Sequence, residues 1–174
     1  MTAPGDEPRG EARGGGVARG GGEARGGGEA PAPVRVTVRL NGTPHTADVE
    51  PRTLLVDFIR DRGLTGTKIG CEDGACGACT VQLDGEPVLA CLTLAVQAHD
   101  ADVRTIEGLD DDHPLKAAFH AHDAVQCGFC TAGILMLLDA HRHQDPETLD
   151  RTLRGNLCRC TGYRPIIDAS RSAR

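Results

Sequence analysis

Eight cysteines in two groups of four constrain this 174-residue chain more than any other feature of its sequence. The first group consists of Cys71, Cys76, Cys79 and Cys91, and the second of Cys127, Cys130, Cys158 and Cys160. Eight cysteines are compatible with four disulfides, with two metal sites of four thiolates each, or with free thiols. The N-terminus contains no apolar run that could act as a secretion signal, so we expect reduced thiols, which favours metal over disulfides.

The first group has the C-x4-C-x2-C spacing of plant-type ferredoxins, which predicts a 2Fe-2S cluster. A cluster held by four thiolates is anionic and is stabilised by backbone N–H groups that turn toward its sulfur atoms. Gly70, Gly74 and Gly77 would permit the backbone angles that such a loop needs, and Cys91 would arrive from an adjacent strand. A zinc site is the alternative, although zinc sites tend to use paired C-x2-C motifs rather than three ligands from one loop.

The second group combines a C-x2-C pair with a C-x-C pair and is less specific by itself. Each pair lies beside the start of a predicted helix, where free N–H groups and the helix dipole favour thiolates and an anionic cluster. Zinc remains an alternative for this group on local spacing alone.

The organisation of the chain predicts a tail and two domains. Residues 1–32 are rich in glycine, arginine and alanine and alternate basic with acidic side chains, which is typical of a disordered tail. In a first domain at residues 33–108, apolar alternation predicts a strand at 34–40, a turn at Asn41-Gly42 and a returning strand at 45–49. A helix after Thr53, taken as its N-cap, and strands at 80–83, 88–92 and 103–106 complete this domain.

Residues 109–174 are predicted to form a helical domain, with helices at 112–122, 132–143, 147–154 and from about Pro165 onward. The fold class is therefore α+β, a small sheet packed on one helix and followed by an all-α four-helix domain. Because aromatic residues make up only 2% of the chain, both cores would be thin, and bound metal would contribute to folding.

Four sequence blocks resemble the iron-sulfur subunit of the xanthine dehydrogenase and aldehyde oxidase family, the molybdenum hydroxylases. They are GTKIGCEDGACGACTV, ACLTLA, QCGFCTAG and GNLCRCTGYRPI, in the family's order and approximate spacing. The resemblance implies a β-grasp ferredoxin-like domain that binds one 2Fe-2S cluster through the first cysteine group, and a four-helix domain that binds another through the second. It also implies that Gln126 and Cys160 contact the molybdopterin cofactor. At Ala132 the family often has proline, a difference at a helix start and not at a ligand.

The same resemblance implies an electron-transfer subunit of a multi-subunit molybdenum-containing oxidoreductase, with the catalytic centre on a partner. The expected partners are a molybdopterin-binding large subunit and an FAD-binding medium subunit, since this chain is too short to hold either domain. Electrons would pass from molybdopterin through both clusters to FAD or another acceptor while an aldehyde, N-heterocycle or similar substrate is oxidised. A zinc-stabilised interaction module and a stand-alone ferredoxin are the alternatives.

Charge and hydropathy exclude other classes of protein. The net charge of -6, without a concentrated basic face, argues against nucleic-acid binding. No apolar stretch is long enough to span a membrane, so a soluble cytoplasmic protein is expected. The seven histidines are predicted to be solvated, because eight cysteines already complete two ligand sets. Arg159 and Arg164 are expected at the surface, with a cofactor phosphate or partner contact as the alternative, and Phe129 is expected to pack over a cluster.

Overall fold

The computed structural model describes residues 31–173. The predicted tail at residues 1–32 therefore lies outside the described residues, except for its last two positions. Within 31–173, buried apolar side chains form two separate cores, one drawn from residues 36–103 and the other from residues 109–169. The domain boundaries stay predictions, and the two cores are described in turn.

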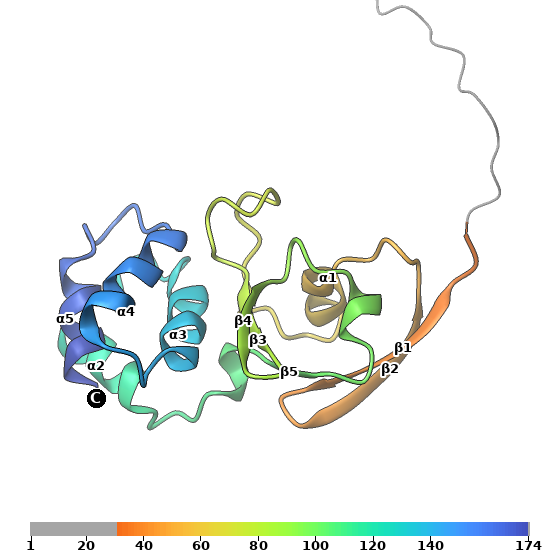
Figure 1. The fold of residues 1–174 in the computed structure, drawn as a ribbon, viewed down its shortest axis with the longest axis horizontal. Coiled ribbons are helices and arrows are strands. Elements are labelled where there is room, and N and C mark those ends of the chain that lie inside the picture. Colours follow the sequence, from red (N-terminus) through yellow and green to blue (C-terminus); the bar gives the residue numbers. More distant parts are fainter. Residues whose placement is uncertain (1–30, 174) are drawn as a thin grey trace, which may run out of the picture. The chain divides into compact units, whose positions relative to one another are not determined.

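Five strands form one mixed sheet around the first core (Figure 1): β1 (Val34–Leu40), β2 (Thr43–Val49), β3 (Thr80–Leu83), β4 (Glu86–Leu89) and β5 (Asp102–Arg104). Their order in the sheet is β2-β1-β5-β3-β4. The pairs β1–β2, β3–β4 and β3–β5 are antiparallel, whereas β1 and β5 run parallel. This mixed sheet confirms the predicted ferredoxin-like architecture.

Both hairpins turn through residues with positive φ angles, as two-residue turns between twisted strands require. Asn41 and Gly42 have φ values of 50° and 82°, and Asp84 and Gly85 have values of 50° and 87°. The alternation in β1 places Val36, Val38 and Leu40 in the core. The predicted strand and turn at residues 34–42 are therefore confirmed.

The helix α1 (Leu55–Arg60) covers the sheet with Phe58 and Ile59 in the core. Its N-cap is Leu54 and not Thr53, so the predicted cap is wrong. The physical reason is that the first helical N–H groups bond to a neighbouring loop: Leu55 N donates to Thr93 O at 2.7 Å, and the next N–H donates to Ala90 O. These bonds satisfy donors that a side-chain cap would otherwise serve.

Three strands differ from their predicted ranges. β2 begins at Thr43 rather than at residue 45, because its pairing with β1 continues up to the turn, where Leu40 faces Thr43. β4 ends at Leu89 rather than at residue 92, because Leu92 N bonds back to Leu89 O at 2.9 Å in a turn. Cys91 therefore lies in that turn and not in a strand. β5 ends at Arg104 because the chain enters a 3-10 turn at Ile106–Gly108.

The second core is built by four helices, which confirms the predicted all-α part: α2 (Pro114–Ala121), α3 (Thr131–Ala140), α4 (Pro146–Thr152) and α5 (Arg164–Ser172). Proline stands in the first turn of α2, α4 and α5, where its missing N–H costs no hydrogen bond. The Asp145 carboxylate also caps α4 by accepting from Thr148 N at 2.9 Å.

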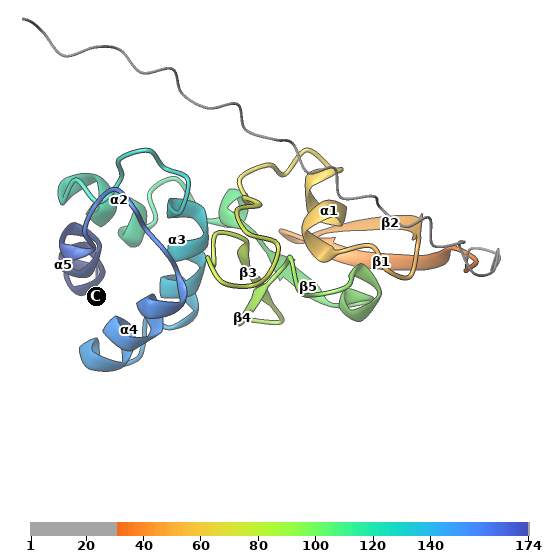
Figure 2. The same ribbon diagram turned by 90° about the horizontal axis from the view of Figure 1, so that it is seen from above.

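Helix α3 joins the helical part to the sheet, and it lies beside β3 and β4 in both views (Figures 1 and 2). All its residues from Ala132 to Asp139 are buried, because the sheet covers one side of the helix and α2 packs against another. A helix that is apolar on nearly all sides is expected at such a central position.

Candidate iron-sulfur sites

The first cysteine loop wraps inward through residues with positive φ angles. Glu72, Gly74 and Gly77 have φ values of 60°, 84° and 69°, which confirms the prediction for the two glycines and adds Glu72. Gly70 does not share this conformation, so its predicted role differs. A Cβ at Gly70 would lie 2.9 Å from Cys76 Sγ, and this glycine therefore makes room for a sulfur atom.

The four thiols of the first group lie in two pairs. Cys71 and Cys76 interact directly, with Cys76 N donating to Cys71 Sγ at 3.3 Å. Hydrogen bonding with the Asp73 carboxylate raises the pKa of Cys71, but donation from the backbone N–H groups of Asp73 and Cys76 outweighs it and the pKa is lowered overall. Burial, followed by the neighbouring Cys71, raises the pKa of Cys76. Burial also raises the pKa of Cys79 to about 12, and the adjacent thiol of Cys91 adds to this rise.

The second group surrounds the start of α3. Cys130 is the N-cap residue of this helix, and Gly128 has a φ of +81° in the turn before it. Cys160 Sγ lies 3.5 Å from Cys127 Sγ, and Cys158 interacts with Cys130. The structure thus brings the C-x2-C and C-x-C motifs together as two crossed pairs of thiols.

Within each crossed pair the two pKa values move in opposite directions. The Phe129 N–H and the Cys160 thiol lower the pKa of Cys127, while Cys127 raises that of Cys160. Burial and Cys158 raise the pKa of Cys130 to about 12. Burial raises the pKa of Cys158, but hydrogen bonds from the Thr161 hydroxyl and nearby N–H groups outweigh it and lower the value.

This donor set fits two binuclear clusters. All eight cysteines are free thiols. The thiols of each group lie in two pairs, an arrangement that suits two irons with two thiolates each. Ionising one thiol of a pair opposes ionising the other, and bound iron would remove this conflict.

Tyr163 holds the loop that carries Cys158 and Cys160. Its hydroxyl accepts from Cys158 N at 2.9 Å and donates to Asn156 O at 3.1 Å. The residue has a φ of +70°, an unusual value for a side chain of this size. Sequence reasoning gave Tyr163 no role, although its place three residues after Cys160 was visible.

The two cysteine groups are joined by direct contacts. Leu157 N, next to Cys158, donates to Cys76 O at 2.8 Å, and Asn156 Nδ2 donates to Gly77 O at 2.9 Å. The Phe129 ring lies against the first loop, because a Cβ at Gly70 would be 3.3 Å from a ring carbon. Only one hydrogen bond and a few covalent bonds therefore separate a cysteine of one group from a cysteine of the other.

The other predicted functional residues lie at the surface around the second group. Gln126, Cys127 and Cys160 are exposed, and so are the apolar side chains of Val125, Phe129 and Leu157. Arg159 is exposed, and Arg164 forms a helix-surface ion pair with Asp168 at 2.8 Å.

The prediction that all histidines are solvated is wrong for His113, which is buried. Its ring Nδ1 accepts from Leu115 N at 3.3 Å and so caps α2, while its Nε2 lies 3.2 Å from Asp139 Oδ1. The signal for this role was its position directly before Pro114 at a predicted helix start.

Comparison with known proteins supports both parts of the site. Residues 38–102 match the model of a 2Fe-2S iron-sulfur cluster binding domain, and residues 105–171 match that of a 2Fe-2S binding domain. Among solved structures, quinoline 2-oxidoreductase from Pseudomonas putida 86 is 46% identical with a TM-score of 0.76, over 80% of this chain and 91% of that chain. The aldehyde oxidoreductase from Desulfovibrio desulfuricans is 40% identical with a TM-score of 0.75, over 80% of this chain and 17% of that longer chain.

Three relatives are named as subunits of dehydrogenases or of an oxidoreductase. The 6-hydroxypseudooxynicotine dehydrogenase complex subunit beta of Paenarthrobacter nicotinovorans is 50% identical, over 78% of this chain and 91% of the relative. The caffeine dehydrogenase subunit gamma of Pseudomonas sp. strain CBB1 is 49% identical, over 79% of this chain and 89% of the relative. The aldehyde oxidoreductase iron-sulfur-binding subunit of Escherichia coli K12 is 41% identical, over 83% of this chain and 73% of the relative.

Two consecutive 2Fe-2S binding domains define an iron-sulfur protein with one centre in a sheet-based part and one in a helical part. The relatives and solved structures narrow this class further. The chain belongs to the iron-sulfur small subunits of the molybdenum hydroxylases, the xanthine dehydrogenase and aldehyde oxidase family, as the sequence blocks predicted.

Proposed function

We propose that this protein is the electron-transfer subunit of a multi-subunit molybdenum hydroxylase, and that it carries electrons between the molybdopterin site and FAD or another acceptor. The observation that supports this most directly is the contact between its two cysteine groups through the Leu157 N–H and the Cys76 carbonyl. A bound 2Fe-2S cluster accepts and releases single electrons. The residues of this chain would hold two such clusters at a fixed separation.

The first cluster would be bound by Cys71, Cys76, Cys79 and Cys91, and the second by Cys127, Cys130, Cys158 and Cys160. The pairwise placement of the thiols supports these ligand sets. Backbone N–H groups that already point at Cys71 and Cys127 would stabilise the anionic clusters.

The exposed face around the second group would bind the molybdopterin-carrying large subunit. Val125, Phe129 and Leu157 are exposed apolar side chains close in sequence to Cys127, Cys130 and Cys158, with Leu157 55% exposed. A partner that covers these side chains would remove apolar area from water and shield the exposed thiols of Cys127 and Cys160. Gln126, on the same face, could then donate or accept hydrogen bonds at the cofactor.

The first group would face the acceptor side of the complex, an FAD-binding subunit in our proposal. Leu92, next to Cys91, is the exposed apolar residue at this group. The reaction class of the complex would be oxidation of an aldehyde, an N-heterocycle or a similar carbon centre, as the names of the relatives suggest. Within residues 31–173, no helix is long and apolar enough to cross a membrane. We propose a cytoplasmic location, in which the thiols stay reduced.

The test is to purify the full-length chain anaerobically and measure its iron and its electron paramagnetic resonance (EPR) spectrum. We expect about four irons per chain, as two binuclear clusters require, and two distinct signals after dithionite reduction. Cys91→Ser and Cys160→Ser serve as matched variants, and each should remove a different signal while the other persists. Bound zinc in a colourless protein, or loss of both signals in each variant, would contradict the proposal.

A further inference from the structure

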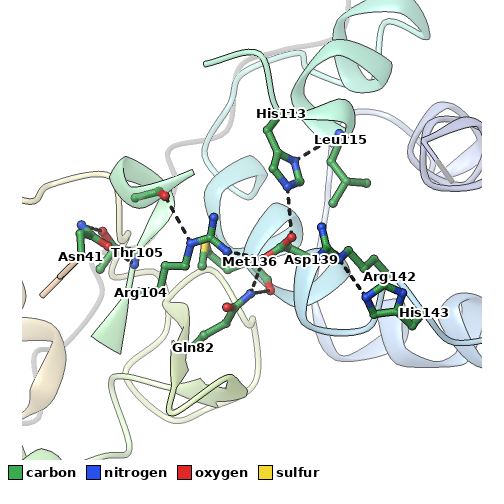
Figure 3. Close-up of polar contacts among 11 residues, drawn as sticks. Asn41, Gln82, Arg104, Thr105, His113, Leu115, Met136, Asp139, Arg142 and His143 are labelled. Atoms are coloured by element: carbon green, nitrogen blue, oxygen red, sulfur yellow. Dashed lines mark hydrogen bonds and ion pairs between the residues drawn. The ribbon is translucent and has the colours of Figure 1, made fainter. Parts of the chain in front are cut away.

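Asp139, near the end of α3, is a buried carboxylate that contacts three structural elements besides its own helix (Figure 3). Only 8% of the Asp139 residue is exposed to solvent. Its Oδ2 atom accepts from Gln82 Nε2 at 2.9 Å and from Arg104 Nη1 at 3.0 Å, and its Oδ1 atom lies 3.2 Å from His113 Nε2. A buried carboxylate is stable only when such donors satisfy it.

Two of these donors come from the sheet. Gln82 lies on β3 and its Nε2 also donates to Met136 O of α3 at 3.0 Å, so one side chain bonds to α3 twice. Arg104 lies at the end of β5, and its Nε donates to Gly108 O at 3.2 Å while its Nη1 reaches Asp139. Two side chains of the sheet therefore bind α3 by donating hydrogen bonds to the same carboxylate.

The third donor comes from the helical part. Because His113 Nδ1 accepts from Leu115 N, the ring proton is assigned to Nε2, which faces Asp139. His113 is the N-cap of α2. Asp139 thus ties α3 to β3, β5 and the start of α2 at one point.

This point lies at the opposite end of α3 from the cysteines. Both β3 and α3 begin directly after a cysteine, Cys79 and Cys130 respectively. Near that end, Gly133 of α3 packs on the backbone at Gly77 and Ala78. Gly133 and Asp139 are six residues apart, or about 9 Å along a helix.

The contacts made by Gly133, Asn156 and Leu157 all lie at the cysteine end of α3, where they meet Cys76, Gly77 and Ala78. Contacts at one end alone leave the direction of a helix less constrained than contacts at both ends do. We propose that Asp139, held by Gln82 and Arg104, is a positioning residue that fixes the angle between α3 and β3 and thereby the separation of the two clusters. This inference rests on the proposed function. It assigns a role in electron transfer to a site that contains no cluster ligand.

The polar character of the contact supports a role in orientation. Apolar side chains of similar size would fill the same space with no desolvation cost, and replacing buried ion pairs in this way is often neutral for stability. The hydrogen bonds at 2.9 and 3.0 Å, in contrast, depend on the angle between donor and acceptor. Apolar packing has no such directional preference.

The test measures the magnetic interaction between the two reduced clusters in the full-length, cluster-containing chain. This through-space interaction falls with the cube of the distance between unpaired electrons. Arg104→Met retains most of the stem of a partly exposed side chain but removes its donors, and Asp139→Asn removes the charge. We expect both variants to keep wild-type iron and both EPR signals, but with a weaker or more widely distributed splitting and slower electron transfer between the clusters.

Arg104→Lys, in contrast to Arg104→Met, should retain the wild-type splitting because it keeps a cationic donor toward Asp139. Asp102→Asn is the matched control, since it breaks the exposed Arg39–Asp102 pair within the sheet and should leave the splitting unchanged. Unchanged splitting in Arg104→Met and Asp139→Asn would overturn the inference, and if Asp139→Asn does not fold, Arg104→Met decides alone. A wild-type chain without two cluster signals would overturn the proposed function itself, and the inference with it.

Discussion

Gly133 is a residue at which α3 closely approaches the first cysteine loop. A Cβ at this position would collide with Gly77 O and would lie 2.9 Å from Ala78 O. Both obstacles are backbone atoms of a loop that also carries Cys76 and Cys79. They cannot rotate away as the end of a flexible side chain could.

Gly133→Ala should therefore destabilise the protein by about 1–3 kcal/mol through overpacking. The sign of this change in stability is informative. At an uncrowded helical position, replacing glycine by alanine would stabilise the protein by roughly 1 kcal/mol. Gly155→Ala is the control, since nothing lies within 4 Å of its new methyl group. Thermal unfolding followed by circular dichroism provides the measurement, and a higher midpoint for Gly133→Ala would contradict the close approach.

At this scale, sequence reasoning was informative where a residue type has one main chemistry. Cysteine spacing predicted two groups of thiols, and the structure gathers each group as two pairs. Glu72 and Tyr163 were missed as positive-φ residues, because glycine is the residue that normally indicates this conformation. The ligand assignment itself stays a prediction until iron is measured.

The loop from Asn156 to Tyr163 is held by hydrogen bonds of the Tyr163 and Thr161 side chains rather than by regular secondary structure. The Tyr163 hydroxyl bridges a donor at Cys158 and an acceptor at Asn156. The Tyr163 hydroxyl therefore links two backbone positions of the loop that presents two thiols.

Tyr163→Phe should leave the Cys158 N–H without a partner, at a cost of about 1–3 kcal/mol if that group stays buried. The effect should be local to the second cluster. With a chelator present, we expect the EPR signal of that cluster to decay faster than in the wild type, while the signal of the first cluster decays at its original rate and serves as the internal control. Equal decay of both signals would show that the hydroxyl does not support this loop.

Elements with strong periodicity were predicted well, and elements that depend on distant partners were not. The strand at 34–40 and its turn follow from local alternation and from Asn41-Gly42. The start of α1 was misplaced because its N–H groups bond to Ala90 and Thr93, which lie far away in the sequence. The range of β4 was also wrong, since a turn at Leu92 decides where that strand ends.

Across the whole molecule, one thiol in each of the four pairs has a raised pKa. These thiols are Cys76, Cys79, Cys130 and Cys160. For Cys79 and Cys130, burial raises the pKa to about 12, so both hold protons in the iron-free fold at neutral pH. Iron must displace these protons when it binds.

The affinity of the iron-free chain for ferrous iron should consequently fall as the pH falls, by up to about tenfold per pH unit for each proton displaced. Because two of the values lie near 12 rather than at the ordinary 9.0, the dependence should continue above pH 9 instead of levelling off. Anaerobic titrations with ferrous iron across this range would measure it. Cys79→Ser and Cys130→Ser should each make the slope shallower, and a pH-independent affinity would contradict the expectation.

The contact between the two halves was the feature least accessible from the sequence. Asp139 and Gln82 are 57 positions apart, and neither belongs to a motif. Taken one at a time, His113 at a helix start, Arg104 at a strand end and Asp139 in an apolar helix do not predict a shared contact. Only the fold shows that they meet.

The seam at Gly77 and Gly133 also bears on how such chains can be recombined. Gly133 approaches the backbone of Gly77 and Ala78 there, and the Asn156 side chain bonds to Gly77 O, so the fit at that point depends on two glycines and one asparagine. Hybrids that join the sheet-based half of one relative to the helical half of another should therefore assemble, provided that both glycines and the partners of Asn156 and Asp139 are inherited together. The names of the relatives span nicotine, caffeine and aldehydes, and a shared seam of this kind would let one electron carrier serve many chemistries.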